Sequence, residues 1–391
     1  MARRDAFGLT PPVMKRVVVV GAGAFGGWTA LQMLKAGAHV ELFDAWGAGN
    51  SRSSSGGKTR VIRAIYGPDR IYTEMVKRAF DMWDALAQSS GEKLYTEMGT
   101  LWMCREDDAY VRASLPILHD LGFPVDQFTV AEAARRYPQI DFKGVKSVWL
   151  ERRAGALLAR QACGVVRDAF VKAGGKYRTA QVKPGPIKNG TMSIPGLQAD
   201  AYVFACGPWL GKLFPEVIGD RVRPTRQEIY YFGAPEGSDR YRAGRLPIWI
   251  DFGKRIVYGI PDTEGRWFKV ADDTRGEKYD PTTGDRKASK EGIERARRFL
   301  AERFPELAKA PLLSAEVCQY ENSPDGNLII DRHPVANNVW LVGGGSGHGF
   351  KLSPAVGETV AQAVLGGQPI PEPFRLQRLH DLEKRRTQFG K

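Results

Sequence analysis

The chain has 391 residues, of which 43% are hydrophobic and 26% charged. This balance is ordinary for a globular protein, predicts two or three domains, and excludes a collagen-like, disordered or coiled-coil chain. A formal net charge of +13 favours anionic partners such as small carboxylates, phosphates or nucleic acid, although a well-solvated basic surface explains it equally.

The first predicted elements form a nucleotide-binding start. Arg16–Val20 is a short β-branched run, typical of a buried parallel strand. A glycine-rich turn, a helix at Ala24–Lys35, a second strand at 39–43 and an acid, Asp44, follow in order. The turn has the spacing Gly-x-Gly-x-x-Gly and consists of Gly21, Ala22, Gly23, Ala24, Phe25 and Gly26.

Each part of this motif has a physical role in holding a dinucleotide. Gly21 permits the tight turn, Gly23 lets the backbone approach a pyrophosphate, and Gly26 allows helix and strand to pack closely. The helix N-terminus attracts the phosphates, and Asp44 can accept hydrogen bonds from a ribose. The motif predicts dinucleotide binding over a purely structural glycine turn, but it does not choose between FAD and NAD.

The rest of the chain alternates between helical and strand-rich stretches. Helical spacing predicts helices at 71–89, 111–121, 130–137, 157–173, 290–304 and 353–365. Strands are predicted at 93–104, 176–183, 200–205, 223–232, 247–251, 255–260, 267–271 and 339–342. The basic end, 375–391, is expected to be a solvated helix and tail.

Strands between 223 and 271 follow one another without helices, which predicts a mostly antiparallel sheet there. The nucleotide-binding sheet needs strands from the start, middle and end of the chain. We therefore expect an α/β (α+β) fold, with a Rossmann-like FAD-binding domain interleaved with an antiparallel-sheet substrate domain. The first domain is expected at 14–92, 152–215 and 321–391, and the second, catalytic domain at 93–151 and 216–320.

Four further segments point to one family. They are Thr59 to Arg63, Glu316 to Tyr320, Asn327 to Asp331 followed by His333 and Pro334, and Gly345 to Lys351. With the glycine motif, this set resembles the monomeric sarcosine oxidase and N-methyltryptophan oxidase family, within the D-amino-acid-oxidase-like group of FAD amine oxidases. The resemblance extends from Val17 to about Leu365.

This resemblance implies an enzyme that oxidises the C–N bond of a secondary amine or of an N-substituted or cyclic amino acid. Hydride passes to the flavin, the imine is hydrolysed, and dioxygen is reduced to hydrogen peroxide. The FAD is expected to be attached covalently through Cys318, because a thiolate is a competent nucleophile. Without the resemblance, Cys318 would be read as a small core residue.

The resemblance also assigns the charged residues. Arg63 and Lys351 match the pair that holds the substrate carboxylate, and Lys269 matches the lysine that activates dioxygen. Arg60 is expected over the flavin, and His348 is a weak candidate for proton transfer. The alternatives without a role in catalysis are an ion pair between Arg63 and a structural acid, solvent exposure of Lys351 and Lys269, and a structural role for His348.

Aromatic and cofactor-contacting residues complete the implied site. Tyr258 and Tyr320 match substrate-pocket residues, with plain packing as the alternative. The expected cofactor-binding residues are Gly21, Gly23, Ala24, Phe25, Gly26, Asp44, Ser54, Thr59, Arg60, Val182, Cys206, Gly207, Cys318, Gly345, Gly347, His348, Gly349 and Lys351.

The sequence departs from the family at the substrate side. Asp273 stands where the family usually has a histidine, and the loop before Thr59 reads Ser-Ser-Ser-Gly-Gly. An acid beside the pocket would attract a second positive charge or a polyol. We also expect Trp249 and Asp251 on a pocket strand. Together these residues favour a sugar-amine (Amadori) adduct, a basic amino acid or a cyclic imino acid over sarcosine.

Three other functions remain open at this point: an FAD amine dehydrogenase or demethylase, a tRNA-modifying flavoenzyme, and a non-catalytic nucleotide-binding protein. No nucleic-acid module is recognisable, so we do not expect nucleic acid as a partner. We expect a small amine substrate, dioxygen, a monomer or weak oligomer, and no metal or membrane partner. Four cysteines and a polar N-terminus favour the cytoplasm.

Overall fold

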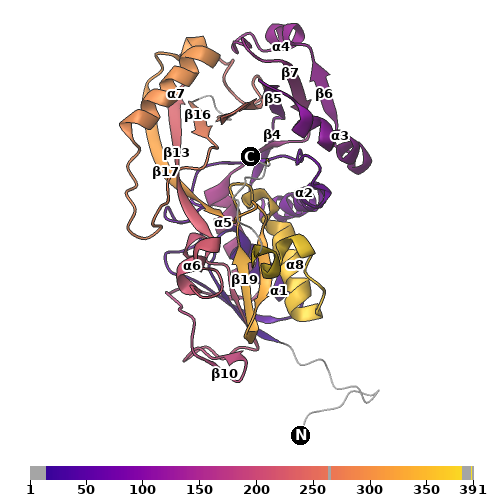
Figure 1. The fold of residues 1–391 in the computed structure, drawn as a ribbon, viewed down its shortest axis with the longest axis vertical. Coiled ribbons are helices and arrows are strands. Elements are labelled where there is room, and N and C mark those ends of the chain that lie inside the picture. Colours follow the sequence, from indigo (N-terminus) through magenta and orange to yellow (C-terminus); the bar gives the residue numbers. More distant parts are fainter. Residues whose placement is uncertain (1–14, 263–265, 381–388, 390–391) are drawn as a thin grey trace.

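A computed structural model describes residues 15–262, 266–380 and 389. The elements fall into two regions that lie one above the other along the longest axis of the molecule (Figure 1). Strand β19 and helices α1 and α8 occupy the lower region, and β13, β16, β17 and α7 occupy the upper one. Because the first and last thirds of the chain meet in the lower region, the expected interleaved mixed α/β architecture is confirmed.

The lower region contains a six-stranded sheet in the order β18-β19-β12-β1-β2-β9. Val17 of β1 pairs in parallel with Ala201 of β12 and with Val40 of β2. Strands from the start, middle and end of the chain therefore form one sheet, as predicted. The strands are β1 (Arg16–Val20), β2 (His39–Asp44), β9 (Lys176–Thr179), β12 (Ala201–Phe204), β18 (Ile329–His333), which is antiparallel, and β19 (Ala336–Gly343).

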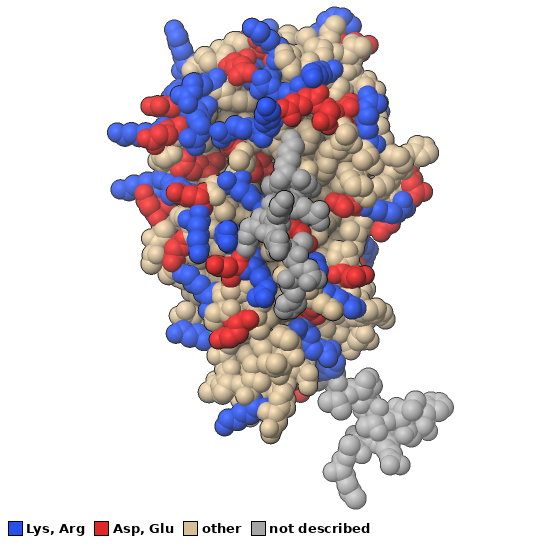
Figure 2. Space-filling model, in the orientation of Figure 1, with Lys and Arg blue, Asp and Glu red and all other residues tan. Residues whose placement is uncertain are grey.

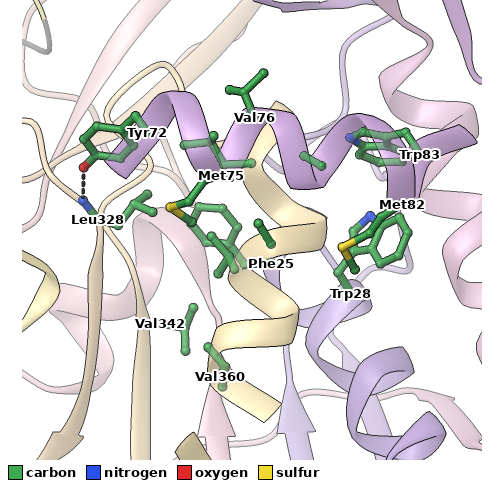
Figure 3. Close-up of a cluster of buried hydrophobic side chains, with 14 of the residues drawn as sticks. Phe25, Trp28, Tyr72, Met75, Val76, Met82, Trp83, Leu328, Val342 and Val360 are labelled. Carbon is green, nitrogen blue, oxygen red and sulfur yellow. Dashed lines mark hydrogen bonds between the residues drawn. The ribbon is translucent and has the colours of Figure 1, made fainter. Parts of the chain in front are cut away.

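Helices pack on this sheet through an aromatic core (Figure 3). Trp28 and Trp83 meet edge to face at 5.1 Å, and the Leu328 N–H donates to the Tyr72 hydroxyl oxygen at 3.2 Å. A Cβ on Gly357 would lie 2.6 Å from the Trp28 carbonyl carbon, so only glycine permits this helix crossing. The helices are α1 (Ala24–Lys35), α2 (Arg70–Ser90), α5 (Ala159–Lys172) and α8 (Ser353–Gly366).

The upper region contains an eight-stranded sheet in the order β17-β13-β16-β15-β14-β5-β7-β6. Its neighbours are antiparallel except for β14 and β5, which run parallel. Helix α7 (Lys290–Arg303) covers one face. The strands are β5 (Thr100–Cys104), β6 (Val125–Phe128), β7 (Ser147–Glu151), β13 (Arg223–Gly233), β14 (Ile248–Phe252), β15 (Ile256–Pro261), β16 (Trp267–Asp272) and β17 (Leu312–Asn322).

The remaining five strands form a three-stranded and a two-stranded sheet of their own. All five of these strands span only two or three residues, too few for a periodic pattern, and only Tyr95–Glu97 falls within a predicted strand, at 93–104. The strands are β3 (Arg60–Ile62), β4 (Tyr95–Glu97), β8 (Gly155–Leu157), β10 (Ile187–Lys188) and β11 (Thr191–Met192). The remaining α-helices are α3 (Ala109–Leu121) and α4 (Val130–Arg136), which were predicted, and α6 (Leu210–Leu213). The division into two domains at the residues given above stays a prediction.

The C-terminal segment differs from the expected solvated helix and tail. Leu376–His380 forms a 3-10 helix in which Leu379 is buried, and Arg378 donates to Asp325 at 2.9 Å. Phe389 packs against Tyr110 and Phe252, with ring centroids 5.2 and 5.5 Å away. The rest of the expected tail, 381–388 and 390–391, lies outside the described residues.

Charged side chains of both signs are spread over one face of the molecule (Figure 2). Lys and Arg side chains are interspersed with Asp and Glu on that face. Arg240 and Glu306 form an exposed pair of opposite charges, at 3.2 Å. In the part of the chain that the structure describes, no helix combines the length and apolar character needed to cross a membrane.

Candidate active site

The glycine turn lies at the carboxyl ends of the parallel strands. The Gly21 N–H donates to the Phe43 carbonyl oxygen at 2.7 Å, which joins the turn to β2. Gly21 has a φ of +103°, and a Cβ there would lie 2.3 Å from the Ala205 carbonyl oxygen. A Cβ on Gly26 would lie 1.8 Å from the Gly21 oxygen. Neither position can hold a larger residue without moving the strand or the helix.

A cavity of about 180 Å³ opens beside this turn and reaches toward the upper sheet. Five expected cofactor residues do not line it. Gly26 packs between Gly21 and Ala205, the Thr59 carbonyl accepts from Lys269, and Cys318, His348 and Lys351 line a second cavity. The expected residues that do line it are Gly21, Gly23, Ala24, Phe25, Asp44, Ser54, Arg60, Val182, Cys206, Gly207, Gly345, Gly347 and Gly349.

Asp44 is fixed at one end of this cavity. Its Oδ2 accepts from the Ala22 N–H at 2.8 Å, and its Oδ1 accepts from the N–H groups of Trp46 and Gly47, each at 2.9 Å. Burial raises the pKa of Asp44, and the three N–H donors oppose that shift. Ser55, which the sequence analysis missed, accepts from the Ala24 N–H at 3.1 Å at the start of α1.

The cavity fits a dinucleotide such as FAD. Its glycine-lined turns leave backbone accessible at both ends, and two buried polar atoms on its wall lack a partner among the described residues. These atoms are Ser54 Oγ and Glu321 Oε2. Because buried polar groups are almost always hydrogen-bonded, both atoms indicate a polar occupant. Ser54 was expected to contact the cofactor, whereas Glu321 was not.

Arg60 lies at the far end of the cavity, next to Cys318. Its guanidinium donates to the carbonyl oxygens of Ser54 at 2.6 Å and Thr59 at 2.8 Å, and to the Cys318 Sγ at 3.2 Å. It therefore ties the loop before β3 to strand β17. Arg60 lines both this cavity and a second one, together with Tyr320, Gly347 and Phe350.

The second cavity, of about 60 Å³, contains two buried cations. Arg63 is 4% exposed, donates to the Ile65 carbonyl oxygen, and lies 4.9 Å from the Tyr66 ring and 5.0 Å from the Trp102 ring. Lys351 Nζ donates to the His348 carbonyl oxygen at 2.9 Å. Burial, and then the Arg63 charge, hold the pKa of Lys351 well below its usual range.

Asp273 lies in the same cavity as these cations. Its Oδ1 accepts from the Tyr320 hydroxyl at 2.6 Å. Burial raises the pKa of Asp273 to about 6, against the opposing effects of Tyr320, Arg63 and Lys351. Tyr258 lines the cavity beside them, as expected. The cavity can therefore bind an anionic group at one place and a cationic or hydroxylic group at another.

His348 lines this cavity, but both of its ring nitrogens are engaged. Nε2 lies 2.9 Å from the Gly326 carbonyl oxygen, and Nδ1 lies 3.1 Å from the Tyr66 hydroxyl. Since a carbonyl only accepts, Nε2 carries the proton and Nδ1 accepts from Tyr66. Burial, and then the nearby Lys351, lower the pKa of His348 to about 3. This geometry favours a positioning role over proton transfer.

Lys269 is fully buried, so its reading as an exposed strand lysine is wrong. Its Nζ donates to the Thr59 carbonyl oxygen at 3.1 Å and lies 5.5 Å from the Tyr258 ring centroid. Burial, and then Arg60, lower the pKa of Lys269 to about 7. Because Thr59 precedes Arg60, this amine lies next to the junction of the two cavities.

The expectation that Trp249 and Asp251 face the pocket is wrong. Trp249 stacks on Phe268 at 5.7 Å, on the opposite face of the sheet, under α7. The Arg303 guanidinium donates to Asp251 at 2.8 Å on that same face. Ile250, between them, lines the cavity instead. Strand β14 is buried on both faces, so it lacks the polar–apolar alternation that would show which residues point inward.

Phe389 is a cavity residue that no pattern in the sequence indicates. Its ring centroid lies 5.5 Å from the Arg63 guanidinium carbon, and the residue lines the second cavity. Within the described ranges, no group of three His, Cys, Asp or Glu side chains is placed to hold a metal ion.

Known proteins resemble this chain over most of its length. A family model described as FAD dependent oxidoreductase matches residues 16–363. The monomeric sarcosine oxidase of Arthrobacter sp. (strain TE1826) is 29% identical over 361 residues, which cover 90% of this chain and 92% of that protein.

Two solved structures share the fold. L-proline dehydrogenase from P. horikoshii superposes with a TM-score of 0.83 at 21% identity, covering 96% of this chain and 100% of that one. Fructosamine oxidase (Amadoriase II) from Aspergillus fumigatus superposes with a TM-score of 0.78 at 22% identity, covering 97% of this chain and 93% of that one.

Proposed function

The chain belongs to the FAD-dependent oxidoreductase family, and from this premise we propose that it oxidises the C–N bond of a secondary amine or of an N-substituted or cyclic amino acid. Bound FAD supplies the two-electron acceptor for this chemistry, and dioxygen is reduced to hydrogen peroxide. One observation carries the proposal: Arg63 and Lys351 share a small cavity with Asp273, and this cavity meets the glycine-lined cavity at Arg60 and Tyr320.

Arg63 and Lys351 would hold the substrate carboxylate. The Arg63 guanidinium offers a planar pair of donors, and the Lys351 ammonium adds a compact charge. An entering carboxylate would raise the lowered pKa of the buried Lys351 and so favour its charged form. The rings of Tyr66 and Trp102 fix the direction of Arg63, so the carboxylate would orient the reacting carbon reproducibly.

Asp273 would select a second feature of the substrate. Its carboxyl accepts from Tyr320 and lies near Arg63 and Lys351, so it can face the amine or a polyol of the substrate. A cavity of about 60 Å³ favours a compact cyclic imino acid or N-alkyl amino acid, including a basic one, over a sugar-amine (Amadori) adduct. The Amadori adduct is the second candidate.

The chain's own residues would hold FAD between the two sheets. Asp44 and the glycine turn would bind the adenosine half, and the 343–349 turn would lie against the flavin half. We propose that Cys318 attaches to the flavin through a thioether. The Arg60 guanidinium donates to its Sγ at 3.2 Å and so holds the sulfur beside the junction of the two cavities.

Lys269 would promote the reaction with dioxygen. Its buried ammonium, next to the junction of the cavities, would stabilise the negative charge that dioxygen gains on reduction. This residue favours an oxidase. The alternative is an amine dehydrogenase or demethylase that passes electrons to another acceptor.

A substrate screen with two readouts tests the proposal. The purified protein is supplied with sarcosine, L-proline, N-methyl-L-lysine, fructosyl-glycine and the carboxylate-free amine pyrrolidine, and both oxygen uptake and peroxide are measured. We expect turnover of at least one carboxylate-bearing amine and far slower turnover of pyrrolidine. Reduction of an artificial dye without oxygen uptake would select the dehydrogenase, and inertness toward every amine would reject the proposal.

A further inference from the structure

Glu321 is a buried acid in the wall of the glycine-lined cavity, and the proposed function gives this residue no role. It lies near the end of β17, is 7% exposed, and faces the cavity between Gly207 and the 343–349 turn. Its Oε1 accepts from the Gly345 N–H at 3.3 Å. Its Oε2 has no partner among the described residues. One half of the carboxyl therefore holds a loop, and the other half is available to an occupant of the cavity.

The surroundings of Glu321 favour its neutral form. Burial raises the pKa of Glu321 to about 7, and the Gly345 N–H opposes this rise. Among the described residues the Cys206 thiol is a titratable group close to Glu321, and burial raises the pKa of that thiol. A buried carboxyl without an adjacent cation is less costly when protonated. A protonated carboxyl can also donate a hydrogen bond, which a carboxylate cannot.

The position of Glu321 along the cavity identifies the part of the cofactor it would meet. Asp44 and Trp46 mark one end, where the adenosine is expected, and Arg60 with Cys318 marks the flavin end. Glu321 follows Cys318 by three residues on β17, and Cys206 is close enough to both Asp44 and Glu321 for their charges to raise its pKa, so Glu321 lies between these ends. A Cβ on Gly207 would lie 3.4 Å from the Glu321 Oε2. The part of FAD between its two ring systems is the ribityl–pyrophosphate linker, which is rich in hydroxyl and phosphate oxygens.

We propose that Glu321 is a cofactor-recognition residue whose Oε2 hydrogen-bonds the ribityl–pyrophosphate linker of FAD. The proposal rests on FAD as the cofactor of the proposed function. The neutral carboxyl donates to a phosphate or hydroxyl oxygen of the linker. Ionisation removes that donor and places a negative charge near the pyrophosphate, so binding weakens as the pH rises through about 7.

Flavin affinity of the full-length protein tests this inference. All proteins carry Cys318→Ala, so that flavin exchange is reversible, and dissociation constants for FAD and riboflavin are measured by flavin fluorescence without any amine. Glu321→Gln keeps a neutral donor, and Glu321→Leu removes all hydrogen bonds. Glu316→Gln and Glu316→Leu, on the same strand and outside the cavity, are the matched controls.

We expect Glu321→Leu to weaken FAD binding about tenfold, Glu321→Gln to stay within about threefold, and both Glu316 variants to match the parent. A loss for FAD alone assigns the bond to the pyrophosphate, and an equal loss for riboflavin assigns it to the ribityl chain. The parent should bind FAD less well above about pH 7, by more than Glu321→Gln does. Lys269 titrates in the same range in both proteins, so the difference between them isolates Glu321.

Two results would overturn the inference: equal FAD affinity for Glu321→Leu and the parent, or the same pH profile for Glu321→Gln and the parent. The melting temperature of each apoprotein identifies a folding defect, and Glu321→Gln keeps the test valid if Glu321→Leu does not fold. Because no amine is present, failure here leaves the proposed oxidation untouched. Conversely, a screen in which the protein oxidises no amine would not alter the measured affinities for FAD and riboflavin.

Discussion

Replacement of Arg63 by methionine tests whether the buried cations hold a substrate carboxylate. Methionine keeps an unbranched stem that can pack against Tyr66 and Trp102, but it removes the guanidinium. Two charge-assisted hydrogen bonds to a carboxylate contribute about 1.5–3 kcal/mol each, of which Lys351 retains part. A loss of about 3–4 kcal/mol lowers kcat/KM by about a hundredfold to a thousandfold.

The assay compares a cyclic amino acid with its carboxylate-free analogue. For L-proline, Arg63→Met should lower kcat/KM by that factor, mainly through KM. For pyrrolidine, the already low activity should change little. Arg78→Met is the matched control, because Arg78 forms an exposed ion pair with Glu358 at 2.6 Å, and such pairs contribute about 0–1 kcal/mol. It should retain the activity of the parent.

The two substrates separate recognition from a general structural effect. An equal loss for L-proline and pyrrolidine would mean that Arg63 supports the fold of the site and not the carboxylate. An Arg63→Met enzyme as active as the parent on L-proline would refute the assignment altogether. Arg63→Lys, which keeps the charge without the planar fork, should fall between the two proteins.

Three further changes test other parts of the site. Lys269→Met should slow flavin reoxidation by dioxygen about a hundredfold, while the rate of anaerobic flavin reduction by the amine stays within a few-fold of the parent. In the parent, reoxidation should slow as the pH rises through about 7, because the Lys269 ammonium loses its proton there. A reoxidation rate that does not change with pH would contradict this role. In acid precipitation the parent should keep its yellow colour in the pellet, and Cys318→Ala should release it to the supernatant; release by the parent would exclude the thioether. Trp249→Ala should lower the free energy of unfolding in urea by about 3–5 kcal/mol without changing KM, whereas a large rise in KM would return Trp249 to the pocket.

Local sequence signals predicted the nucleotide-binding part of the fold well. The helix at Ala24–Lys35 was predicted with its observed bounds, because the glycine turn marks its start and Gly37 follows its end. The three chain segments that form the parallel sheet were also recognisable, because each is a short apolar run buried on both faces. The charged residues came from motif resemblance, and the structure brings Arg63, Lys351 and Asp273 together.

Side-chain direction and long-range packing could not be predicted in the same way. Trp249 and Ile250 are both apolar neighbours on a fully buried strand, so nothing in the sequence shows which of them faces the cavity. Phe389 reaches Arg63 across more than three hundred residues of sequence, a contact that no local pattern encodes. Glu321 could have been noticed only as an acid within an otherwise buried strand end.

Anaerobic mixing of the purified protein with a carboxylate-bearing secondary amine tests the central claim most directly. The account predicts that the visible flavin band bleaches on mixing, and that admission of air restores it with release of an equal amount of hydrogen peroxide. A protein without flavin absorbance, or a flavin band that no such amine bleaches, would contradict the account.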